Sequence, residues 1–78
     1  MLMGKWFRLN KPTIALDVVD GKRKAVLLPE GMTVQVVRPA DGEGLIGLQC
    51  DLGTLLMFAI DLTARGEPMP DRHTTASP

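Results

Sequence analysis

The chain has 78 residues with nine Lys or Arg, nine Asp or Glu, one Cys and one His, so its formal net charge is zero. One cysteine excludes an internal disulfide, and every apolar run is far shorter than the ~18 residues of a membrane-spanning helix. A chain of this length buries only about 60–65% of its unfolded surface, so self-association is the first source of extra stability to expect.

Three parts are expected along the chain. Residues 1–11 form an N-terminal arm, which has positive charges and no apolar stretch long enough for a secretory signal. Residues 12–66 form the folded domain, and residues 67–78, rich in Pro, Ser, Thr and charges, form a disordered tail. A single reduced cysteine without an export signal predicts a cytoplasmic protein.

The first two predicted strands form a hairpin. In residues 13–19, Ile14, Leu16 and Val18 occupy alternate positions, which is the period-two pattern of a half-buried strand. The dipeptide Asp20-Gly21 supplies the turn, because Gly tolerates positive φ and Asp can bond its own backbone. The second strand, residues 25–28, follows a basic triplet in or beside the turn, which consists of Lys22, Arg23 and Lys24.

Three more strands and a helical turn follow. The strands are predicted at residues 32–38, 45–50 and 54–58, separated by turns or loops that contain Gly and Pro or Asp. Both faces of the last strand are apolar, so it lies inside a closed barrel or one of its faces is covered by something else. Residues 61–66 predict one helical turn, with Asp61 as the N-cap and Gly66 as the left-handed residue at its end.

The element order over residues 12–66 resembles the SH3-like barrel class. We therefore expect an all-β fold, a small five-stranded SH3-like barrel with one short helical turn near the C-terminus. Residues 58–67, together with the Leu-Pro-Glu-Gly segment at 28–31, are similar to small uncharacterised bacterial proteins of that class.

One enzyme of similar size and fold is the type II plasmid dihydrofolate reductase, whose tetramer encloses an active-site pore. Its last-strand motif is Val-Gln-Ile-Tyr after Gly-Ser, and here Gly53-Thr54 precedes Leu55-Leu56-Met57-Phe58. The frame resembles that motif, but Leu56 stands in place of the amide and Phe58 in place of the phenol. The groups that would orient folate and nicotinamide are therefore missing.

No catalytic constellation is visible elsewhere. His73 is the one histidine and lies in the predicted tail, and Cys50 alternates with aliphatic residues, as expected for a buried, inert thiol. Asp17 is expected to pair with a cation across the sheet. No metal-ligand spacing and no phosphate-binding Gly-rich loop occurs. We therefore expect a protein that is not an enzyme and binds no cofactor and no metal.

The candidate contact residues are the apolar ones of the arm, Trp6, Phe7 and Leu9. They are expected to cover the second apolar face of the strand at 54–58, either in the same chain or on a neighbouring subunit. Burying one aromatic side chain contributes about 4–6 kcal/mol before entropy costs, which is enough to decide the oligomeric state of a small domain. The leading hypothesis is an interaction module that forms a homo-oligomer or binds a protein partner.

The alternative is a nucleic-acid-binding module that uses Lys22, Arg23 and Lys24, with the aromatic residues of the arm as stacking elements. Against it, the isoelectric point of about 6.5 is well below that of strongly basic nucleic-acid-binding domains. A third alternative is an oligomeric, pore-type enzyme, to which no residue is assigned.

Overall fold

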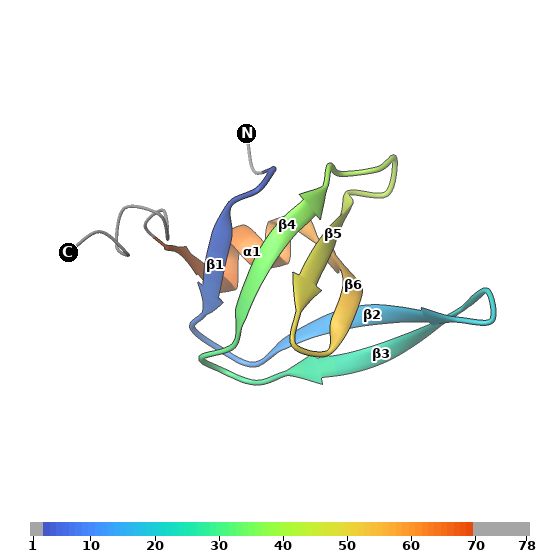
Figure 1. Ribbon diagram of the computed structural model, residues 1–78, viewed down its shortest axis with the longest axis horizontal. Coiled ribbons are helices and arrows are strands. Elements are labelled where there is room, and N and C mark those ends of the chain that lie inside the picture. The colour runs from blue at the N-terminus through green and yellow to red at the C-terminus, as the bar shows by residue number, and fades with distance from the viewer. Residues whose placement is uncertain (1–2, 70–78) are drawn as a thin grey trace.

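A computed structural model describes residues 3–69, which form one antiparallel sheet and one short helix (Figure 1). In chain order the elements are β1 (Trp6–Leu9), β2 (Thr13–Val19), β3 (Lys22–Leu28), β4 (Thr33–Arg38), β5 (Leu45–Cys50), β6 (Gly53–Phe58), α1 (Ala59–Arg65) and β7 (Gly66–Pro68). The seven strands lie in the order β3-β2-β6-β5-β4-β1-β7, with β3 and β7 as the two edges. The prediction of an all-β fold is confirmed, while the sheet is open and has more strands than the five predicted.

In the hairpin of β2 and β3, the first strand has the predicted bounds, and the second strand begins three residues earlier than predicted. Asp20 and Gly21 have φ of 53° and 75°, so they form a two-residue turn in which both central residues have positive φ. Turns of this kind match the twist of the flanking strands. The strand β3 therefore begins directly after the turn, and the basic triplet belongs to it.

Two short strands are not predicted by the sequence. The expected N-terminal arm contains β1, which pairs with β4 through Phe7↔Val34 and with β7 through Phe7↔Pro68. The first residues of the expected tail belong to β7, and residues 70–78, including His73, lie outside the described residues. The arm is thus part of the sheet.

The helix α1 begins two residues earlier than the predicted helical turn. Its N-cap is Phe58, which makes no side-chain cap hydrogen bond, so the prediction of Asp61 as the N-cap is wrong. Asp61 lies in the first turn instead, where its charge is favourable beside the positive end of the helix dipole. Gly66 is extended, with φ −109° and ψ 153°, and not left-handed as predicted.

Position 66 requires glycine because the backbone of the helix leaves no space for a Cβ atom. Its backbone N–H donates to the carbonyl oxygen of Leu62, and a Cβ at Gly66 would lie 2.6 Å from that oxygen. This close approach lets β7 follow the helix directly and return beside β1.

One aliphatic core lies on the inner face of the sheet. Its largest fully buried apolar members include Leu9, Leu28, Val34, Val36, Leu48, Met57 and Leu62. In Figure 1, α1 lies behind β1 and β4, and the β2–β3 hairpin runs below the other strands and projects beyond β6. The hairpin is joined to the rest of the sheet through one residue pair, Leu16↔Leu56, so most of its length has no strand on the β6 side.

Candidate interaction surface

The more apolar face of β2 points away from the core. The inward residues are Thr13 and Ala15, which are 1% and 0% exposed, whereas Ile14 and Val18 are 50% and 52% exposed. A half-buried strand normally buries its apolar face, because register and orientation are set by the hydrophobic pattern. The alternation predicted from the sequence is present, but within one chain Ile14 and Val18 stay half exposed.

The neighbouring strands extend this apolar surface. Ile14 lies opposite Leu27 of β3, which is 61% exposed, and Leu16 lies opposite Leu56 of β6. Side chains at directly opposed positions of a sheet share one face. We call this surface the outer face, and it consists of Ile14, Leu16, Val18, Ala25, Leu27, Leu56 and Phe58.

The two apolar faces of β6 differ in burial. Leu55 and Met57 point inward and belong to the core, whereas Phe58 on the outer face is 42% exposed. The sequence allows a closed barrel or a cover over the second face; the sheet is open, and nothing within residues 3–69 covers this face completely. Contiguous exposed apolar patches on small proteins mark interaction sites more often than single exposed residues do.

The predicted contact residues of the arm lie elsewhere. Phe7 and Leu9 are 3% and 1% exposed and belong to the core of their own chain, so the folded protein does not present them to a partner. Trp6 is half-buried on the opposite side of β1, where it lies beside Gln35 of β4. The arm therefore packs within its own chain but against the core face, where Leu55 and Met57 lie, and not over the second face of the strand at 54–58.

The basic triplet is exposed, but its charges are divided between two faces. Lys22 and Lys24 lie on one side of β3, and Arg23 lies on the other, opposite Val18 and at the rim of the outer face. Arg23 donates two hydrogen bonds to the carboxylate of Glu43, at 2.7 and 3.1 Å. These hydrogen bonds lower the pKa of Glu43 and raise the pKa of Arg23. One of the three cations is therefore neutralised at the rim of the outer face.

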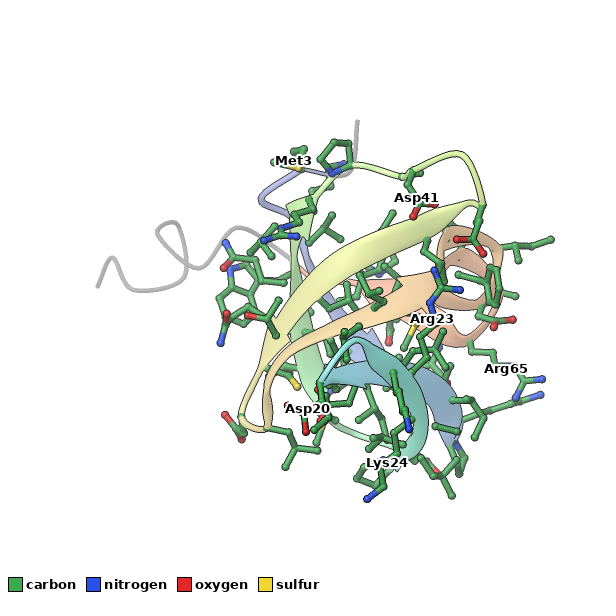
Figure 2. The ribbon with its side chains drawn as sticks, turned by 90° about the vertical axis from the view of Figure 1, so that its right-hand side faces the viewer. Met3, Asp20, Arg23, Lys24, Asp41 and Arg65 are labelled. Carbon is green, nitrogen blue, oxygen red and sulfur yellow. The ribbon has the colours of Figure 1, made fainter. Side chains whose placement is uncertain are left out.

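Glu43 belongs to a loop that is ordered by Asp41. The Oδ1 of Asp41 accepts hydrogen bonds from the backbone N–H of Glu43 at 2.8 Å and of Leu45 at 3.0 Å. The bonds from Leu45 and then from Glu43 lower the pKa of Asp41 below its ordinary value of 3.8. Figure 2 shows Arg23 directed toward the loop that carries Asp41. The loop thus holds the acceptor for Arg23 in place.

The remaining polar candidates form no site. Cys50 is half-buried and its Sγ lies 3.5 Å from the carbonyl oxygen of Gly53, while Asp17 lies opposite Lys24 in the hairpin. Within residues 3–69, no group of three or more His, Cys, Asp or Glu side chains is arranged to hold a metal ion. In the same part of the chain, no helix has the length and apolar character needed to cross a membrane.

A scan against protein-family models and searches of curated proteins and of solved structures found no match to this chain.

Proposed function

We propose that the chain is a non-catalytic interaction module that self-associates by burying its outer face against the outer face of a second copy. The observation that carries this proposal is the orientation of β2, which turns Ile14 and Val18 to solvent and buries Thr13 and Ala15. A contact between identical faces is the commonest form of association among soluble proteins.

The size of the apolar surface supports a reversible contact. Four side chains of the outer face, those of Ile14, Val18, Leu27 and Phe58, are each 42–61% exposed. Burying the exposed half of such a side chain contributes about 0.7–1.5 kcal/mol, or about 6–12 kcal/mol for the four from each of two copies. Association itself costs about 4–15 kcal/mol in lost freedom. The two terms are comparable, so the contact depends on protein concentration.

Charge also favours a second copy as the occupant. All seven residues of the outer face are uncharged, and the Arg23 guanidinium at its rim is paired with Glu43. The whole chain has a formal net charge of zero, so two copies do not repel each other at long range.

A SH3-like frame is part of the proposal. The five strands predicted for it from the sequence correspond to β2 to β6; the set proposed from the structure is a different one, in which β1, β4, β5, β6 and β7 would make the frame and the β2–β3 hairpin would project from it. The support is that β4, β5 and β6 are consecutive antiparallel neighbours and that a short helix leads into β7 beside β1. We also propose a cytoplasmic location, in keeping with the single unpaired Cys50.

A double substitution on the outer face tests the function. Ile14→Lys with Val18→Lys places two charges on the outer face at positions already half in water, so the monomer should fold with an unchanged circular dichroism spectrum. The mass by light scattering is expected to fall below that of the wild type. The matched control is Leu52→Lys, which changes a 59% exposed residue in the turn between β5 and β6 and should keep the wild-type mass. Equal masses for the double variant and the wild type would refute the proposal.

The nucleic-acid alternative has less support. Phe7 belongs to the core and is not a stacking residue, and Arg23 is paired with Glu43, which leaves Lys22 and Lys24 as the open charges of the triplet. Retention on immobilised single-stranded DNA separates the two functions. Retention that falls steeply with salt supports nucleic-acid binding, and no retention at low salt excludes it. A pore-type enzyme gains no support, because β6 supplies Leu, Met and Phe where polar groups would be needed.

A further inference from the structure

We infer that the edge strand β3 pairs antiparallel with β3 of a second copy, across a two-fold axis. This contact rests on the proposed self-association and adds to it a second surface made of backbone atoms. It is separate from the outer face, because pairing at an edge leaves the outer faces of both copies on the same side of the joined sheet.

The hairpin turn determines which backbone groups of β3 are available. In a two-residue turn, the flanking residues Val19 and Lys22 exchange both of their hydrogen bonds, and such pairs recur at every second position. Lys22, Lys24, Val26 and Leu28 therefore bond to β2. The N–H and C=O groups of Arg23, Ala25 and Leu27 point away from it. Among the residues that the structure describes, no strand lies on that side of β3.

Charge and length of overlap together favour one register for β3. A two-fold axis at Ala25 overlaps all seven residues of the strand and places Arg23 of one copy opposite Leu27 of the other. All three outward-pointing residues then exchange backbone hydrogen bonds. A register centred on Lys24 or on Arg23 would set a cation directly opposite its own copy, which is destabilising.

Charges on edge strands usually prevent such pairing, since natural proteins place Lys there to block it. In β3, however, the charges fill one half of the strand, residues 22–24, and uncharged residues fill the other half, residues 25–28. In the register centred on Ala25, each charged half faces the uncharged half of the other copy. The charge pattern therefore disfavours the registers centred on Arg23 and Lys24 and permits this one, which overlaps more of the strand than a register centred on Val26 or Leu27 does.

The opposite edge of the sheet lacks these features. The strand β7 has only three residues and ends in Pro68, which has no N–H to donate. Leu27, the most exposed large apolar residue of the outer face, lies on β3 at 61% exposure. Edge pairing would give it direct neighbours from the second copy, so the inference accounts for the exposure of this side chain.

A proline at Ala25 tests the inference. Ala25→Pro removes an N–H that points away from β2, and proline is tolerated at such positions of edge strands. The mass of the variant by light scattering is expected to be half that of the wild type, with the circular dichroism spectrum of the fold retained. The control Lys22→Thr changes an exposed residue on the other face of β3, keeps every N–H that points away from β2, and should keep the wild-type mass. An Ala25→Pro protein that is folded and has the wild-type mass overturns the inference.

Hydrogen exchange of the wild type provides a test that needs no variant. At a concentration where the protein is associated, the amides of Arg23, Ala25 and Leu27 are expected to exchange at least ten times more slowly than at high dilution. The same rates at both concentrations overturn the inference. If edge pairing fails these tests while the Ile14→Lys, Val18→Lys double variant still loses mass, the proposed function stands without it. If that double variant keeps the wild-type mass, the proposed function fails independently of β3.

Discussion

At the scale of single residues, Asp41 makes the stability of the fold depend on pH. Its carboxylate accepts two backbone hydrogen bonds and its pKa is lowered. The folded state therefore binds a proton at Asp41 less readily than the unfolded state does. The stabilisation is present above the ordinary pKa of 3.8 and is lost as the pH falls through the lowered value.

We predict that Asp41→Asn lowers the melting temperature at neutral pH and that the difference from the wild type shrinks in acid. Asn keeps an acceptor oxygen but has no charge, so the variant lacks the pH-dependent part of the interaction. Thermal melts at about pH 7 and about pH 3 measure it. The control is Asp51→Asn in the turn between β5 and β6, where no hydrogen bond to the carboxylate occurs within residues 3–69. A difference that is the same at both pH values would contradict this prediction.

Gly66 gives a second prediction at this scale. Gly66→Ala sets a Cβ against the backbone oxygen of Leu62, so either the helix end or β7 has to shift. We expect a loss of about 1–3 kcal/mol in the free energy of unfolding, measured by urea denaturation. Gly42→Ala is the control, because no atom lies within 4 Å of a Cβ at that position. Equal stabilities for the two variants would show that the chain has room at Gly66.

These residues also show a limit of prediction from sequence. A glycine that follows a helical pattern usually adopts the left-handed conformation, and Gly66 stands at such a position in the sequence. The actual reason for glycine is the distance to Leu62, which depends on how β7 leaves the helix. Residue type alone does not distinguish the two causes.

At the scale of elements, β1 is the main addition to what the sequence predicts. The strand places Phe7 and Leu9 in the core, so residues expected to contact a partner stabilise the monomer instead. Phe7→Ala is expected to cost about 3–5 kcal/mol of unfolding free energy. Urea denaturation compares it with Trp6→Ala, whose half-buried side chain should cost less. A smaller loss for Phe7→Ala than for Trp6→Ala would contradict the placement of β1.

The predictable strands are those long enough to show a pattern. The bounds of β2 and β5 follow from the alternation of apolar residues over seven and six positions. The strands β1 and β7 have four and three residues, which is too few for a periodic signal, and their pairing joins the two ends of the described chain. The sequence also does not predict which face of β2 points inward, because this orientation depends on the strands that the sheet order places beside β2.

At the scale of the whole molecule, the candidate site moves from the arm to the hairpin. The sequence predicts the aromatic residues of the arm as contact residues because large apolar side chains dominate the energetics of protein interfaces. The better signal in the sequence was the strand at 54–58, apolar on both faces, since one chain of this length has too few elements to cover both. The outer face supplies the surface that this strand shares with the hairpin.

The most direct test of the central claim is the molar mass of the wild-type protein, measured by light scattering over a series of concentrations. A mass of at least twice the 8.5 kDa of one chain, falling toward one chain on dilution, is the result that the outer face predicts. A mass of one chain at every concentration up to about 1 mM would contradict self-association, because it would leave the contact weaker than about 4 kcal/mol.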